Sequence, residues 1–247
     1  MIKRFGLIGF PLSHTFSPDY FAKKFAREGL KHQYAAYEID DILKLDEVLA
    51  DDVSGLNVTI PYKEKIIPFL DTIDEGSKAV GAVNTIKIKD GKLHGFNTDV
   101  YGFRNSLVKL QLPFSIEESK SIILGSGGAA KAVNYVLDQL GSGCTLVSRT
   151  LKTGADITYE ELQGKDLAEF NIIVNTTPLG TFPQVNAMAP ISYNQIYSDH
   201  LVYDLIYNPD KSLLLERAEA RNAVIKNGAE MLILQAEKSW EIWNNEL

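Results

Sequence analysis

The stretch IILGSGGAA, residues 122–130, limits the possible folds more than any other part of the chain. A short apolar run of strand type is followed by a G-x-G-x-x-A loop and then by a segment of helical pattern. In such a loop the glycines allow a tight turn and a close approach to a pyrophosphate, and the helix N-terminus supplies N–H donors. The stretch predicts a dinucleotide site in a parallel α/β sheet, with an ordinary strand-to-helix turn as the alternative.

Apolar runs of strand length alternate with helical patterns along most of the chain. In the first half the expected strands and helices are 5–8, 17–28, 33–39, 41–50, 55–59 and 63–80. In the second half they are 121–124, 127–140, 143–147, 171–175, 200–205 and 223–226. This alternation predicts an α/β protein of two halves with mainly parallel sheets.

A hairpin, a linker and a last helix complete the expected organisation. Segments 82–88 and 93–96 are separated by Lys-Asp-Gly-Lys, in which Asp-Gly is a strong turn signal. A helical pattern over 97–110 is followed by a linker at 111–119 that contains a proline and acidic residues. Segment 230–243 has helical spacing, but periodicity does not show which half it joins.

Composition excludes several classes of protein. Hydrophobic residues make up 45% and charged residues 23% of the 247 residues, as in ordinary folded domains. The net charge of −7 predicts no general attraction to nucleic acid or anionic membranes. The single cysteine, Cys144, lies in an apolar run and is expected to be a small buried residue. With no signal-peptide pattern and no long apolar stretch, a soluble cytoplasmic protein is expected.

The end of the next expected strand indicates which dinucleotide is bound. An NAD site usually has an acidic residue there, whereas this chain has Ser148-Arg149-Thr150. A guanidinium flanked by hydroxyls suits a 2′-phosphate, so NADP(H) is favoured over NAD(H). The alternative is that Arg149 is an ordinary exposed residue at a strand end.

Polar clusters follow several strands of the first half, at residues 13–18, 57–63, 81–85 and 97–99. The edge at which parallel strands end is where open α/β sheets bind ligands. Hydroxyls, amides, Lys63 and Asp99 are expected to converge there, as a polyhydroxylated substrate requires. Taken singly, Lys63 is most simply a solvated lysine and Asp99 a helix N-cap.

Together these motifs resemble the shikimate dehydrogenase family. The resemblance extends over nearly the whole chain through NVTIPYK, GAVNT, NTD, GSGGA, SRT, NTTPLG, YDLIY and the Gln235 segment of the last helix. It implies a substrate-binding domain with a mixed sheet at 1–100, completed by helix 229–247, and a Rossmann-like domain for NADP at 101–228. The implied reaction is the reversible NADPH-dependent reduction of 3-dehydroshikimate to shikimate in aromatic amino-acid biosynthesis.

The resemblance also assigns roles to individual residues. Lys63 matches the catalytic lysine, which exchanges the proton, and Asp99 matches the carboxylate beside it. The matched substrate-binding residues are Thr15, Ser17, Thr59, Asn84, Tyr207 and Gln235. The matched cofactor-binding residues are Gly125, Ser126, Gly127, Gly128, Ala129, Ser148, Arg149 and Thr150.

Two departures from the family pattern concern these sites. Thr15 stands where the family usually has serine, and its methyl group alters the surroundings of the substrate carboxylate. The segment after Arg149 is shorter than usual and carries Lys152 near the place of a second phosphate-binding arginine.

Other functions remain open from the sequence. A quinate/shikimate dehydrogenase of broader specificity and a non-catalytic metabolite sensor are the alternatives, although a sensor has no need of Lys63 as a proton donor. The histidines, at positions 14, 32, 94 and 200, lack ligand spacing, so no metal is expected. The expected partners are small molecules only, and the chain is expected to be a monomer or a homodimer.

Overall fold

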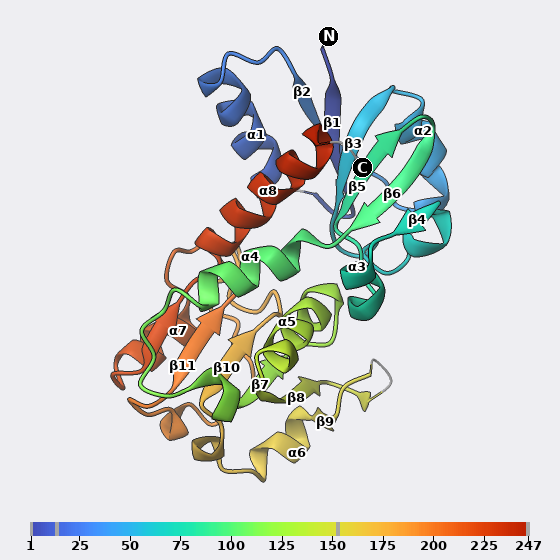
Figure 1. Ribbon diagram of the computed structural model, residues 1–247. Helices are drawn as coiled ribbons and strands as arrows, with labels where there is room; N and C mark the ends of the chain where they lie inside the picture. Colours follow the sequence, from blue (N-terminus) through green and yellow to red (C-terminus); the bar gives the residue numbers. More distant parts are fainter. Residues whose placement is uncertain (1, 13–14, 152–153, 246–247) are drawn as a thin grey trace. The chain divides into compact units, whose positions relative to one another are not determined.

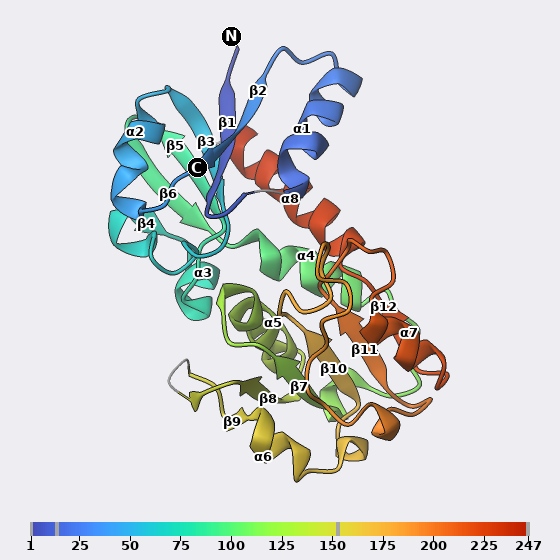
Figure 2. The same ribbon diagram turned by 180° about the vertical axis from the view of Figure 1, so that it is seen from behind.

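The computed structural model of the protein describes residues 2–12, 15–151 and 154–245. They form two compact units, Met1–Tyr101 with Gln235–Leu247, and Gly102–Leu234. We call them the first and the second unit. Each has its own sheet with helices on both faces, which confirms the expected α/β class (Figures 1 and 2). In the described part of the chain, no helix has the length and apolar character needed to span a membrane.

The first unit contains a mixed sheet. Its strands are β1 (Arg4–Gly9), β2 (Gln33–Glu38), β3 (Val53–Val58), β4 (Thr72–Ile73), β5 (Thr85–Lys89) and β6 (Lys92–Phe96). Their order is β2-β1-β3-β5-β6-β4. Strands β1, β2 and β3 are parallel, whereas β5 is antiparallel to both β3 and β6. The hairpin turn has positive φ at both Asp90 and Gly91, as the Asp-Gly pair predicts.

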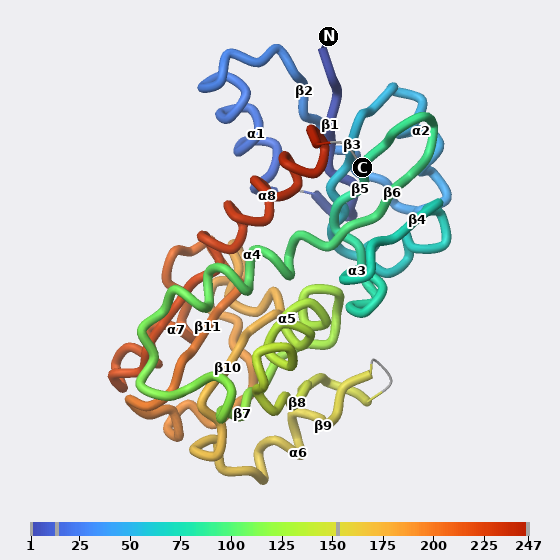
Figure 3. Tube along the Cα trace, viewed as in Figure 1, coloured from blue at the N-terminus to red at the C-terminus, as the bar shows by residue number. Residues whose placement is uncertain are grey.

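Helices cover both faces of this sheet. They are α1 (Phe16–Arg27), α2 (Leu45–Leu49), α3 (Glu75–Val80), the start of α4 (Thr98–Leu107) and the end of α8 (Ala229–Asn244). Period-two alternation sends Phe5 of β1 to a cluster with α1 and α8, and Ile8 to a cluster with α2 on the other face. In Figure 3 the last helix, α8, lies beside α1, from near the start of the chain. The C-terminal segment from Gln235 onward therefore completes the first unit.

Helix α8 is attached to the sheet and to α1 by polar contacts. Trp243 Nε1 donates to Ile86 O at 2.9 Å and stands against Gly55, where a Cβ would come within 2.4 Å of the indole. Nearer the middle of α8, Glu237 pairs with Lys24 of α1 at 2.7 Å. These contacts fix the helix against β3, β5 and α1.

The expected helix over 63–80 is wrong. The structure has a turn, a short 3-10 segment at Ile67–Phe69, β4 and then α3. Pro68 lacks the N–H that a continuous helix needs. A separate helix begins only after Asp74, whose side chain accepts from Gly76 N.

The second unit has an all-parallel sheet. Its strands are β7 (Lys120–Leu124), β8 (Gly143–Ser148), β9 (Ile157–Thr158), β10 (Ile172–Asn175), β11 (Leu201–Asp204) and β12 (Val224–Lys226). Their order is β12-β11-β10-β7-β8-β9. Helices α6 (Tyr159–Gln163) and α7 (Leu213–Glu219) share a core with Ile122, Ile173 and Val202. Helix α5 (Gly128–Gln139) follows β7 and packs on β7 and β8.

Candidate active site

Hydrogen bonds hold the backbone of Lys63 and the residue before it, Tyr62, in place. Strand β3 ends at Val58, and Pro61 lies in a turn that Tyr62 N closes onto Thr59 O at 2.9 Å. Tyr62 is buried and its hydroxyl donates to Ile39 O at 2.6 Å. Val83 N donates to Lys63 O at 2.7 Å. The abrupt end of the strand therefore holds one lysine at the edge where β3 stops.

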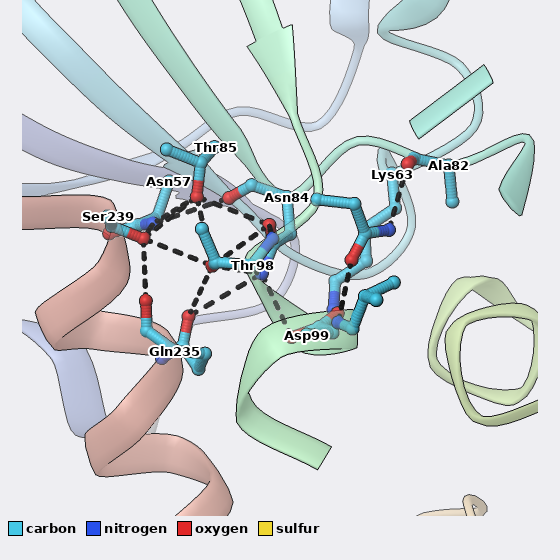
Figure 4. A network of polar contacts seen from close by, with 11 residues as sticks. Asn57, Lys63, Ala82, Asn84, Thr85, Thr98, Asp99, Gln235 and Ser239 are labelled. Carbon is cyan, nitrogen blue, oxygen red and sulfur yellow. Dashed lines mark hydrogen bonds and ion pairs between the residues drawn. The ribbon is translucent and has the colours of Figure 1, made fainter. Parts of the chain in front are cut away.

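Lys63 and Asp99 form a close ion pair. The distance from Lys63 Nζ to Asp99 Oδ2 is 2.5 Å, and the two side chains are 16% and 8% exposed (Figure 4). Little water screens the pair, so the two charges hold each other in place. Asp99 is not the helix cap, because Asn97 Oδ1 accepts from Val100 N at 3.3 Å and α4 begins at Thr98. Its carboxylate is available to the ammonium group.

Asn84 connects this pair to the sheet. Thr98 N donates to Asn84 Oδ1 at 2.7 Å, and a backbone N–H can only donate, so this contact identifies the amide oxygen. Asn84 Nδ2 therefore faces Asp99 and donates to Oδ1 at 2.9 Å. One carboxylate thus accepts from an amide on one oxygen and from an ammonium on the other.

Gln235 reaches the same place from α8. Its Oε1 accepts from the Thr98 hydroxyl at 3.3 Å, and Asn84 Nδ2 lies 3.5 Å away. Figure 4 shows Gln235, Asn84 and Asp99 arranged around Thr98. The structure therefore brings Lys63, Asn84, Asp99 and Gln235 into one cluster.

Behind these residues lies a buried hydroxyl cluster, which we define as Thr85, Thr98 and Ser239. All three are at most 1% exposed. Asn57 Nδ2 donates to Ser239 Oγ at 3.0 Å and to Thr85 Oγ1 at 3.2 Å. Sequence reasoning assigned no role to these hydroxyls, although Thr85 and Thr98 lie inside the motifs GAVNT and NTD. Ser239, one helical turn after Gln235, also had a readable signal in its spacing.

Three further hydroxyl residues of the first unit lie in loops or at a helix start. Thr15 is the N-cap residue of α1, but its side chain makes no capping hydrogen bond. Thr59 follows β3, and its N–H donates to Ile8 O at 2.9 Å. Ser17 is buried in the first turn of α1. The preceding residues Ser13 and His14 lie outside the described part of the chain.

Ser17 is connected to the hydroxyl cluster through Tyr34. The Ser17 side chain is hydrogen-bonded to the Tyr34 hydroxyl. Burial raises the pKa of Tyr34 far above its usual range, so the phenol stays protonated and donates to Asn57 Oδ1 at 2.8 Å. Asn57 then donates to Ser239, as described above. The contacts from Ser17 to Lys63 are thus continuous within the first unit.

Tyr207 belongs to the second unit. It follows β11 and is half-buried. The adjacent Asn208 O accepts from Phe182 N at 3.0 Å, which ties this segment to the loop after β10.

The glycine loop of the second unit has the backbone geometry of a phosphate site. Gly125 has φ of +117°, and a Cβ there would lie 2.4 Å from Thr176 Oγ1. Gly127 caps α5, and a Cβ on it would meet nothing within 4 Å, so its outer side is open to a ligand. Gly128 and Ala129 begin the helix, whose first N–H groups suit a diphosphate. The loop can therefore hold a dinucleotide.

The end of β8 lies next to this loop. Ser126 Oγ donates to Ser148 Oγ at 3.3 Å, which connects the loop to the end of β8. Arg149 and Thr150 follow immediately and are exposed. The guanidinium is accessible to a phosphate. Lys152 lies outside the described residues.

Taken together, the two units offer different chemistry. The first has a lysine that can exchange a proton beside a set of hydroxyl and amide groups. The second has a glycine-rich turn at a helix start and an exposed arginine, groups whose chemistry suits a phosphate. Within the described residues, no three His, Cys, Asp or Glu side chains gather as a metal site would require.

Comparisons with known proteins show which family the chain resembles. A family model described as the shikimate dehydrogenase substrate binding domain matches residues 7–86. The shikimate dehydrogenase (NADP(+)) of Staphylococcus epidermidis is 40% identical over 258 residues, covering 99% of this chain and 93% of the relative.

Solved structures give the same result. Shikimate dehydrogenase 1 from Peptoclostridium difficile has a TM-score of 0.87 and 35% identity, covering 98% of this chain and 92% of that one. Shikimate 5-dehydrogenase from Thermus thermophilus, in complex with NADP(H) and shikimate, has a TM-score of 0.84 and 28% identity. It covers all of this chain, and 95% of its own length is matched. The chain therefore belongs to the shikimate dehydrogenase family.

Proposed function

We propose that this protein is an NADP-dependent shikimate dehydrogenase, which reversibly reduces 3-dehydroshikimate to shikimate for aromatic amino-acid biosynthesis. The observation that carries the proposal is the Lys63–Asp99 pair at 2.5 Å, in a chain that belongs to this family. A bare sensor of the same fold would need neither the lysine nor its partner.

Lys63 is the proton donor in reduction and the proton acceptor in oxidation. When the ketone is reduced, its oxygen gains negative charge and must take a proton. An ammonium group held at the strand edge stabilises that charge and then supplies the proton. NADPH, when bound, supplies the hydride.

Asp99 orients Lys63, and it accepts a hydrogen bond from a substrate hydroxyl. Asn84 holds the carboxylate from its other side, at 2.9 Å. The Asp99 carboxylate accepts hydrogen bonds from both Lys63 and Asn84. These two bonds hold it in place without the substrate. A preorganised group of this kind loses little free energy to reorganisation during the reaction.

The substrate binds to the hydroxyls and amides of the first unit. Thr15 and Ser17, at the start of α1, bind the carboxylate of shikimate. Thr59, Asn84 and Gln235 bind its ring hydroxyls, which need partners that both donate and accept. These assignments make residues 1–100 with helix 229–247 the substrate-binding domain.

NADP(H) binds to residues 101–228. The loop of Gly125, Ser126, Gly127, Gly128 and Ala129 receives the diphosphate at the start of α5. Ser148, Arg149 and Thr150 surround the 2′-phosphate, where an acidic residue would repel it. The open side of Gly127 supports this assignment, since a ligand can approach the backbone there.

We further propose that the protein works in the cytoplasm, as a monomer or a homodimer. Light scattering on the purified chain decides between one and two copies, and a larger assembly would contradict the proposal.

A substrate assay tests the function directly. NADP⁺ or NAD⁺ is mixed with the protein and with shikimate, quinate or no substrate, and reduced cofactor is followed by its absorbance. The expected result is fastest reduction with NADP⁺ and shikimate. Equal rates with quinate would indicate the broader dehydrogenase, and no reduction with any pair would overturn the proposed activity.

A further inference from the structure

Ser239 is a completely buried hydroxyl that joins four polar partners. It lies on α8 and is 0% exposed. Its Oγ is 2.9 Å from Gln235 O, 3.0 Å from Asn57 Nδ2, 2.8 Å from Thr85 Oγ1 and 3.2 Å from Thr98 Oγ1 (Figure 4). A serine that served only to fill space would not be expected to have so many polar contacts.

The direction of these hydrogen bonds follows from the groups that can only donate or can only accept. Asn57 Oδ1 accepts from Tyr34, so Asn57 presents its Nδ2 to Ser239 and Ser239 Oγ accepts there. The Ser239 hydroxyl then donates its single proton to the main-chain carbonyl of Gln235, one turn earlier on α8. Ser239 therefore links the amide of Asn57 on β3 to the backbone that carries Gln235.

The neighbouring threonines extend this link to both amides of the site. Thr98 is attached to Asn84 through its N–H and to Gln235 Oε1 through its hydroxyl, at 2.7 and 3.3 Å. With Oε1 turned to the hydroxyl cluster, the Gln235 amide nitrogen is turned to the other side of the planar group. Thr98 therefore binds the oxygens of both amides, that of Asn84 through its N–H and that of Gln235 through its hydroxyl.

We propose that Ser239 is a positioning residue for substrate binding, which fixes Gln235 on α8 against the hydroxyl cluster. The role rests on the proposed function, because it concerns the same substrate site. Ser239 touches none of Lys63, Asp99 or the glycine loop in the described contacts. It acts through Gln235, and its loss should affect substrate affinity before turnover.

A matched control is available in the same unit. Ser77 on α3 is also 0% exposed, and its hydroxyl is hydrogen-bonded to Asp74, not to the hydroxyl cluster. Ser77→Ala removes a buried serine hydroxyl without changing the amides of Asn84 and Gln235. It separates a general effect of removing a buried hydroxyl from the specific effect at Ser239.

The first test is kinetic. Ser239→Ala is expected to raise KM for shikimate about fivefold or more, the factor of one ordinary hydrogen bond. The values of kcat and of KM for NADP⁺ should stay within about twofold, as for sites that do not interact. Ser239→Cys replaces the hydroxyl by a somewhat larger thiol, which is a weak donor and acceptor, so KM should rise with it as well. This second variant also serves if Ser239→Ala does not fold.

A double-mutant cycle identifies the group through which Ser239 acts. In a Gln235→Ala background, Ser239→Ala should change KM for shikimate by less than about twofold. Full additivity of the two changes would overturn the proposal. So would an unchanged KM in Ser239→Ala, or an equal rise in Ser77→Ala.

A measurement without substrate separates this inference from the proposed function. The side-chain amide ¹H–¹⁵N resonances of Asn84 and Gln235 should shift in Ser239→Ala and Ser239→Cys, and remain in place in Ser77→Ala. If the wild-type protein does not oxidise shikimate, the proposed function fails, and these resonances still decide whether Ser239 positions the amides. Unshifted resonances in both Ser239 variants would overturn the positioning role.

Discussion

Two buried aspartates, one in each unit, have opposite electrostatic surroundings. Asp99 in the first unit pairs with the ammonium of Lys63 and accepts from Asn84. Asp204 in the second unit, at the end of β11, accepts from Asn175 at 2.9 Å, Ile206 N at 3.1 Å and Ser212 at 2.5 Å, all of them neutral. Burial raises the pKa of Asp204 to about 6, and these hydrogen bonds only partly oppose the rise.

The comparison separates two uses of one residue type. Asp99 is held beside the ammonium group of Lys63, and this pair is suited to exchange a proton with a ligand. Asp204 is completely buried and joins β10, β11 and the cap of α7. In the second unit the charge suited to a ligand is the exposed Arg149.

Removing the cation of the first pair should have the largest effect. Lys63→Ala is expected to lower kcat by roughly 10²–10⁴, the range for a general acid. Steady-state kinetics in both directions measure it. Lys65→Ala is the matched control, since Lys65 is exposed two residues further on, and it should keep wild-type turnover. Turnover of Lys63→Ala within a few fold of wild type would remove Lys63 from the mechanism.

Reversing the exposed charge of the second unit should change cofactor choice. A guanidinium–phosphate contact contributes about 1.5–3 kcal/mol, or roughly 10–150-fold. In Arg149→Asp, kcat/KM for NADP⁺ should fall at least about tenfold while that for NAD⁺ stays level or rises. Arg221→Asp, at another exposed arginine of the same unit, should change neither. An equal loss for both cofactors would make Arg149 an ordinary surface residue.

Asp204 has no cation among its hydrogen-bond partners described above, and it should make the stability of the second unit depend on pH. A raised folded pKa means that the folded state binds more protons than the unfolded state. Stability is then fully present below the unfolded pKa and decreases as the pH rises from about 4 to about 6. Relative to Asp204→Asn, the wild-type unit should lose about 2–3 kcal/mol across this window.

The measurement must report each unit separately. Both tryptophans, Trp240 and Trp243, lie on the part of α8 that belongs to the first unit, so their fluorescence reports that unit. Amide hydrogen exchange of β10 and β11, corrected for its intrinsic pH dependence, reports the second. A difference that appears only in the tryptophan signal would contradict the assignment to Asp204.

The smallest predicted effect concerns the backbone of the glycine loop. Gly125→Ala places a methyl group at φ of +117° and against Thr176 Oγ1. Strain of about 1–2 kcal/mol should weaken NADP⁺ binding about tenfold, with shikimate affinity unchanged. Calorimetric titration of both ligands measures it. Gly143→Ala, with open space at the methyl position, is the control, and equal NADP⁺ affinity in the two variants would contradict the role of the loop.

Much of the fold could be predicted because its strands are apolar and its loops carry strong turn residues. The β7–loop–α5 element and the Asp90-Gly91 hairpin follow from local chemistry alone. The prediction of a helix over 63–80 was wrong. The apolar residues there have helical spacing, but Pro68 interrupts the helix. Helix α6 was not predicted because it is very short, although Thr158 and Glu161 form a capping box that the sequence contains.

Less of the site could be predicted from the sequence, because its contacts join residues that are far apart in the chain. The motifs suggested that Lys63 and Asp99 lie near each other, and the structure gives their distance. No local pattern could show that Ser239 meets Thr85 and Thr98, because that meeting depends on how α8 returns to the first unit. The orientation of the Asn84 amide likewise depends on the N–H of Thr98, which comes near Asn84 only in the folded chain.

The return of α8 also affects the order in which the chain can fold during synthesis. The cluster of Phe5, Phe21 and Phe25 is completed by Ala236 and Trp243, from the other end of the sequence. Roughly 130 residues of the second unit are made between these two parts. At the usual speed of translation that is a delay on the order of ten seconds. During this interval the first unit exposes an aromatic surface, and the second unit receives its last residue before the first unit does.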